Sequence, residues 1–161
     1  MRNRHQKGFS LIELLVVVGI ILIIAAIAIP NLMAARMSAN ESSAAGALRT
    51  INTAEISYDM NYPDVGFTDL PSLGGAQPCT PAETSGCFID NFLATNGAGN
   101  GKDGYSFTMQ TAASSTGYGT LAAPLNLNSS GTRAFCSDQT GVIYYNPGNS
   151  ACDSGTGTPL Q

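Results

Sequence analysis

One carboxylate stands inside an otherwise apolar stretch near the start of the chain. From Phe9 to Ile29, a run of 21 residues, only Ser10, Glu13 and Gly19 interrupt the hydrocarbon side chains. An acidic residue costs roughly 2.5–3.5 kcal/mol at the centre of a bilayer helix, and less near its end. A helix that served only as an anchor would carry Leu there. We therefore expect Glu13 to meet a positive charge inside an assembly; the alternative is a carboxylate that snorkels to the membrane interface.

The element that positions Glu13 is a membrane helix. Twenty-one residues in an α-helix, at about 1.5 Å each, span the roughly 30 Å hydrocarbon core of a bilayer. Arg2, Arg4 and Lys7 precede the run, and such flanking basic residues hold an N-terminus on the cytoplasmic side. A cut after Gly8 would place a new α-amine on Phe9, about one helical turn before Glu13.

The stretch Lys7-Gly8-Phe9-Ser10-Leu11-Ile12-Glu13-Leu14 resembles the processing and methylation motif of type IV pilins and type II secretion pseudopilins. The motif covers about the first 30 residues. The resemblance implies that a prepilin peptidase cuts after Gly8 and methylates the Phe9 amine. It also implies that Glu13 pairs with the amine of an adjacent subunit and so sets the registry of a growing filament.

The resemblance further implies a structural subunit, not an enzyme. Identical subunits would form a helical surface filament, and the other partners would be the peptidase, an inner-membrane assembly platform and motor, and membrane lipid before assembly. The chain would reside in the inner membrane and then in an extracellular or periplasmic filament. The alternatives are a pseudopilin of a type II secretion system and an anchored protein that never polymerises. Ala26-Ile27-Ala28 also offers the cleavage site of an ordinary secretory signal.

The pattern divides the chain into three parts. Residues 1–8 form a leader, residues 9–62 a long helix, and residues 63–161 a globular region. Within the helix, residues 9–30 form the membrane or filament-core part, and Pro30 predicts a kink, because proline lacks an N–H and crowds the preceding turn. The later half carries an apolar stripe at helical spacing, formed by Ala44, Leu48, Ile51, Glu55, Tyr58 and Tyr62. Glu41 and Asn52 are assigned to its other, solvent-facing sides.

The globular region predicts strands after a long connection. Tyr105 to Met109 alternates cleanly, Tyr118 to Ala123 is a weaker candidate, and Thr132 to Cys136 with Val142 to Tyr145 forms the best hairpin. Short turns of helix are expected around residues 69–73 and 89–93. The predicted fold class is α+β, pilin-like, with the helix packed on an antiparallel sheet of three or four strands.

The four cysteines all follow the membrane segment, and this even number in a translocated domain predicts disulfides. Three pairings are possible. We favour Cys79–Cys87 and Cys136–Cys152, because each closes a short local loop. The second pair would resemble the C-terminal disulfide of pilins.

Composition excludes several functions. His5 is the only histidine and lies in the leader, so no Ser–His–Asp or Cys–His site can form, and no catalytic residues, cofactor or metal site are expected. Without residues 1–8 the chain has four basic and eleven acidic residues. General nucleic-acid binding is not expected, because phosphate contact needs clustered Lys and Arg.

Overall fold

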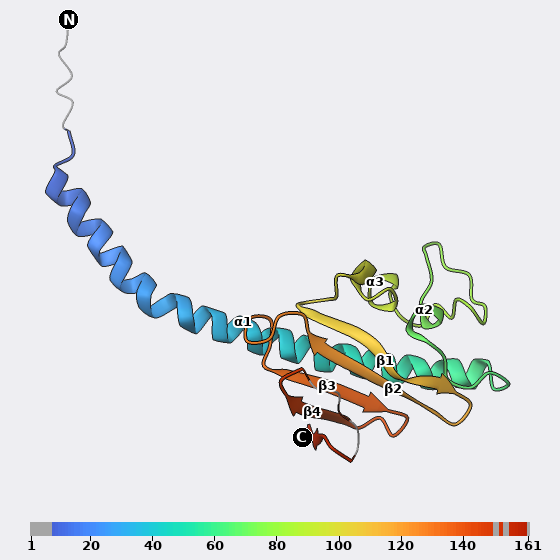
Figure 1. The fold of residues 1–161 in the computed structure, drawn as a ribbon. Helices are drawn as coiled ribbons and strands as arrows, with labels where there is room; N and C mark the ends of the chain where they lie inside the picture. Colours follow the sequence, from blue (N-terminus) through green and yellow to red (C-terminus); the bar gives the residue numbers. More distant parts are fainter. Residues whose placement is uncertain (1–7, 150–151, 153–154, 161) are drawn as a thin grey trace, which may run out of the picture. The chain divides into compact units, whose positions relative to one another are not determined.

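The structure is a computed structural model that describes residues 8–149, 152 and 155–160. The predicted leader therefore lies outside the described residues, except for Gly8. The chain forms two compact units, residues 1–35 and 36–161. The helices are α1 (Leu11–Asn61), α2 (Leu70–Leu73) and α3 (Asn91–Ala94), with a 3₁₀ turn at Gly97–Gly99; the strands are β1 (Tyr105–Ser114), β2 (Gly117–Pro124), β3 (Arg133–Asp138), β4 (Ile143–Pro147) and β5 (Thr158–Pro159) (Figure 1).

The first unit consists, in its described part, of the beginning of α1. Its Leu, Ile and Val side chains point outward around the helix, and all of them are exposed. Pro30 lies within α1, so the helix continues through this residue instead of ending there. Just beyond it, the Asn31 side-chain amide donates to the Ile27 carbonyl at 3.2 Å. A helix that is apolar on all sides requires lipid or other helices around it.

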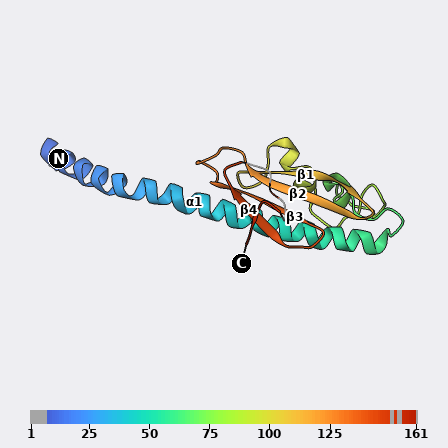
Figure 2. The ribbon, with the colours of Figure 1, turned by 60° about the horizontal axis from the view of Figure 1, so that its bottom comes forward.

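In the second unit, the later half of α1 lies across one face of the sheet (Figure 2). The residues that it buries recur every three or four positions, as the stripe predicts, and they meet the inward side chains of β1 to β4. The largest fully buried side chains are Tyr58, Tyr105, Phe135, Leu48, Ile51, Leu73 and Leu93. The α+β fold, a long N-terminal helix packed on a C-terminal antiparallel sheet, is thus confirmed.

The sheet is an antiparallel meander in the order β1-β2-β3-β4-β5. Its register pairs Phe107 with Ala122, Ala122 with Phe135, and Phe135 with Tyr145. Because paired residues share a face, these four side chains form one inward row beneath α1. The short β5 was not expected from the sequence; it pairs only Thr158 and Pro159 with β4, and so brings the number of strands to five.

Two polar residues of α1 do not lie where the sequence pattern places them. Glu41 and Asn52, assigned to solvent-facing sides, are 7% and 6% exposed and face the sheet. Asn52 donates from Nδ2 to Ser137 Oγ at 2.8 Å and accepts from the Tyr118 hydroxyl at 3.0 Å. Buried polar groups are tolerated where partners satisfy them, and these partners come from strands far along the chain. The stripe is therefore wider than hydrophobicity alone indicates.

Candidate assembly site

The predicted cleavage position lies just outside the helix. Gly8, Phe9 and Ser10 have no regular secondary structure, and the Phe9 side chain is 86% exposed. A Cβ added at Gly8 would meet no atom within 4 Å. Among the described residues, the fold therefore places no steric demand for glycine at this position.

Glu13 has a partner within its own chain that sequence analysis missed. Its carboxylate oxygen Oε2 accepts a hydrogen bond from the backbone N–H of Ser10 at 2.9 Å. Since α1 begins at Leu11, Ser10 precedes the first helical residue and Glu13 is the third. This is half of a capping box, in which an acidic side chain satisfies a backbone N–H at a helix start. The Ser-x-x-Glu spacing, visible in the sequence, could have predicted it.

The surroundings of Glu13 form one face of the helix. Phe9, Ile12, Val16 and Val17 line, with Glu13, an open hollow of about 410 Å³. Their spacing of three and four residues places them side by side along α1. The carboxylate thus lies on an apolar face, where a second helix could contact it. α1 contains a segment that is long and apolar enough to cross a membrane.

A second carboxylate, Glu41, fastens α1 to the sheet. Its Oε1 accepts from the backbone N–H and hydroxyl of Thr132, both at 2.8 Å. Its Oε2 accepts from the Nε and Nη2 of Arg133 at 2.9 and 2.6 Å. Burial by itself would raise the pKa of Glu41, but the Thr132 N–H and the Arg133 guanidinium outweigh burial and hold this pKa below its usual value.

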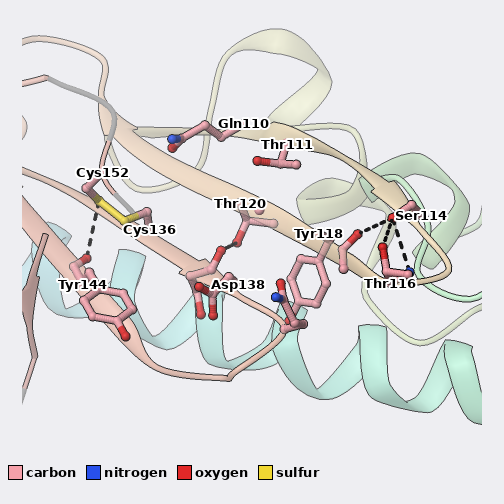
Figure 3. A pocket seen from close by; sticks show the side chains of 14 residues that line it. Gln110, Thr111, Ser114, Thr116, Tyr118, Thr120, Cys136, Asp138, Tyr144 and Cys152 are labelled. Carbon is pink, nitrogen blue, oxygen red and sulfur yellow. Dashed lines mark hydrogen bonds between the residues drawn. A yellow bond between two sulfur atoms is a disulfide. The ribbon is translucent and has the colours of Figure 1, made fainter. Parts of the chain in front are cut away.

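The structure forms two disulfides, Cys79–Cys87 and Cys136–Cys152. The first closes a loop before α3. The second joins β3 to the C-terminal segment, on the sheet face opposite α1. Beside it lies a hollow of about 320 Å³, lined by hydroxyl and amide side chains from β1, β2 and the β3–β4 turn (Figure 3). Each disulfide limits the freedom of a short loop in the unfolded chain.

The described residues contain no group of three His, Cys, Asp or Glu side chains that could hold a metal ion. The two buried carboxylates of the described residues are not arranged for catalysis. Glu41 is fully engaged by Thr132 and Arg133, and Glu55 receives one backbone hydrogen bond from Thr68 at 3.0 Å.

Comparison with known proteins identifies a motif in the N-terminal segment. Residues 3–29 match the prokaryotic N-terminal methylation motif. The type IV wide pilus major component of Thermus thermophilus is 62% identical over 39 residues, 24% of this chain and 30% of that protein. The type IV major pilin protein of Myxococcus xanthus is 45% identical over 56 residues, 35% of this chain and 26% of that protein.

A fimbrial protein of Pseudomonas aeruginosa is 38% identical over 87 residues, 45% of this chain and 56% of that protein. The aligned part thus spans less than two thirds of each of these relatives. No solved structure matches the chain significantly. The N-terminal methylation motif, the similarity to pilins and the long helix packed on an antiparallel sheet support assignment of the chain to the type IV pilin family.

Proposed function

We propose that the chain is a structural subunit that polymerises into a helical surface filament. The observation that carries this proposal is the fully apolar, exposed start of α1 with Glu13 on one of its faces. Such a surface needs lipid before assembly and identical helices after it. The names of the relatives, which are pilus and fimbrial proteins, support the same function.

Processing would create the positive charge that Glu13 requires. A prepilin peptidase cuts after Gly8, where the backbone is exposed and non-helical, and methylates the Phe9 amine. The methylated amine of one subunit then meets Glu13 of its neighbour. A buried charge pair of this kind contributes registry more than stability, since an out-of-register subunit leaves both charges unpaired.

The Ser10 hydrogen bond gives the free subunit a way to hold Glu13 in lipid. A hydrogen bond to a charged group contributes about 1.5–3 kcal/mol, comparable with the insertion cost of an acidic residue. In the filament, the incoming amine supplies charge as well as a donor. An inner-membrane platform and motor would extract the subunit, and Pro30 would let the helix bend or locally unwind as the subunits pack.

Two variants separate the charge of Glu13 from its hydrogen bond to the Ser10 N–H. Glu13→Gln keeps an oxygen that can accept from Ser10 N–H but removes the charge, whereas Glu13→Ala removes both. We expect processing to continue in both variants and assembly to fail in both. Val17→Ala, on the same apolar face, is the control and should assemble. Normal filaments from Glu13→Gln would contradict the role of the charge.

The first measurement is the intact mass of the protein in the sheared surface fraction and in the membrane fraction. A methylated chain beginning at Phe9 and abundant in the sheared fraction supports a surface filament. The same mass confined to membranes would indicate a pseudopilin of a type II secretion system or a minor subunit. A chain that retains residues 1–8 in both fractions would leave only an anchored protein.

A further inference from the structure

The segment that follows α1 contacts both the sheet and Glu55. Residues 65–69, here called the strap, run from the end of α1 past the β1–β2 turn to α2 (Figure 1). Phe67 donates its backbone N–H to the Ser114 carbonyl at 3.2 Å, and its ring lies 5.0 Å from the Tyr118 ring. Thr68 donates its backbone N–H to Glu55 Oε2 at 3.0 Å. The strap thus covers Glu55 and is held by it.

Glu55 is a buried acid that faces no cation among the described residues. Its side chain is fully buried, and within this part of the chain Oε1 has no hydrogen-bond partner. The titratable groups around it are Asp69 from the strap, Tyr118 from β2 and Tyr58 one turn further along α1. Within the described residues, the charged side chain that affects the pKa of Glu55 is another carboxylate, that of Asp69, and no cation does so. An ionised Glu55 would therefore be a buried negative charge with one hydrogen bond.

We propose that the strap is a pH-dependent latch: it stays docked on the sheet while Glu55 is protonated, and it opens when Glu55 ionises. The neutral acid fits this fully buried site, where it has one hydrogen bond, because it carries no charge to desolvate. The carboxylate needs water, and the strap is what separates it from water. Opening residues 65–69 hydrates Glu55 and moves Asp69 away from it, without disturbing the Glu41 and Asn52 contacts that hold α1 on the sheet.

The pH range follows from the surroundings. Burial, opposed in part by the Thr68 hydrogen bond and assisted by the Asp69 carboxylate, raises the pKa of Glu55 from 4.5 to about 7. In the open strap the carboxyl would titrate near its ordinary value. Linkage between the two states makes the opening equilibrium rise with pH, by roughly tenfold between about pH 6 and pH 8.

The test is hydrogen exchange of the full chain in detergent micelles, measured by mass spectrometry at several pH values and corrected for the intrinsic exchange rate at each. Amides of the strap should lose about tenfold of their protection between about pH 6 and pH 8. The β3–β4 hairpin, from the same samples, should keep its protection. Constant protection of the strap, or a parallel loss across the sheet, would overturn the proposal.

Three variants identify the titrating group. Glu55→Gln keeps an acceptor for the Thr68 N–H but cannot ionise, so its strap should stay protected at every pH. Glu41→Gln, the other buried Glu of α1, should keep the pH response of the wild type. Asp69→Asn should lose less strap protection between about pH 6 and pH 8 than the wild type, because it removes the charge that disfavours ionised Glu55 in the docked state. This result does not depend on whether Glu55→Gln folds.

A strap that still opens with pH in a folded Glu55→Gln variant would exclude Glu55 as the switch. An undiminished loss of protection in Asp69→Asn would contradict the electrostatic argument. The latch acts within one subunit, so its failure would leave the filament proposal unaffected.

Discussion

Removal of the Glu41 carboxylate should detach the first turns of the packed half of α1 from β3. Glu41→Ala leaves the Thr132 N–H, the Thr132 hydroxyl and the Arg133 guanidinium without their shared acceptor. Breaking a fully buried ion pair costs about 3–5 kcal/mol. The Arg133 side chain is 38% exposed, so water can replace part of the lost contact. We expect a loss of about 2–3 kcal/mol in the free energy of unfolding.

Urea unfolding of the full chain in detergent, followed by tyrosine fluorescence, would measure this loss. The chain has no Trp, and its six Tyr residues, from Tyr58 to Tyr145, all lie in the second unit, so the signal reports that unit alone. Glu83→Ala removes an exposed carboxylate and is the matched control, expected to change the free energy of unfolding by less than about 0.5 kcal/mol.

The pH dependence of the free energy of unfolding of the same variants tests whether the ionised form of Glu41 is the stabilising one. The pKa of Glu41 is lowered by folding, so its stabilisation is present above about pH 4.5 and is lost as pH falls through the lowered value. Glu41→Gln should lack this part of the acid sensitivity. A Glu41→Ala variant as stable as the wild type, with an unchanged urea m-value, would refute the inference that this carboxylate fastens helix to sheet.

Three further predictions rest on the second unit. Glu55→Gln should raise the free energy of unfolding at about pH 8 relative to the wild type, by up to about 3 kcal/mol, and this difference should vanish toward about pH 4.5. The reason is that the raised pKa of Glu55 makes the wild type less stable as pH rises. Urea titrations at both pH values would measure the difference. Asn52→Ala and Tyr118→Phe should show a coupling of about 1 kcal/mol in a double-mutant cycle, and strict additivity would mean that their hydrogen bond contributes nothing. Joint replacement of Cys136 and Cys152 by Ala should cost about 3 kcal/mol, because their disulfide closes a loop with a sequence separation of 16; a change below about 1 kcal/mol in non-reducing urea titrations would contradict this loop-closure estimate.

The sequence alone determined the features that depend on neighbouring residues. The apolar run with Glu13, the helix that the structure places at Leu11–Asn61, and the alternation of Tyr105, Phe107 and Met109 all follow from local spacing. The pairing of the cysteines was favoured for the same kind of reason, since near neighbours in the chain close short loops. The Ser10–Glu13 cap is equally local, since the Ser-x-x-Glu spacing is visible in the sequence.

Tertiary structure decided which polar side chains of α1 are buried. Glu41 belongs to the helical stripe by its spacing, but a carboxylate is buried only where donors converge on it. Its donors, Thr132 and Arg133, are separated from it by 91 and 92 residues. Asn52 likewise depends on Tyr118 and Ser137.

The environment of Glu55 likewise depends on both local spacing and tertiary structure. Its place in the stripe predicts burial. The path of the strap decides that, among the described residues, Thr68 is its one hydrogen-bond donor and no cation faces it. Helical periodicity fixes the direction in which a side chain points, because it is a property of the backbone. Whether a charge in that direction is satisfied depends on residues brought there by other segments, and this only the folded chain decides.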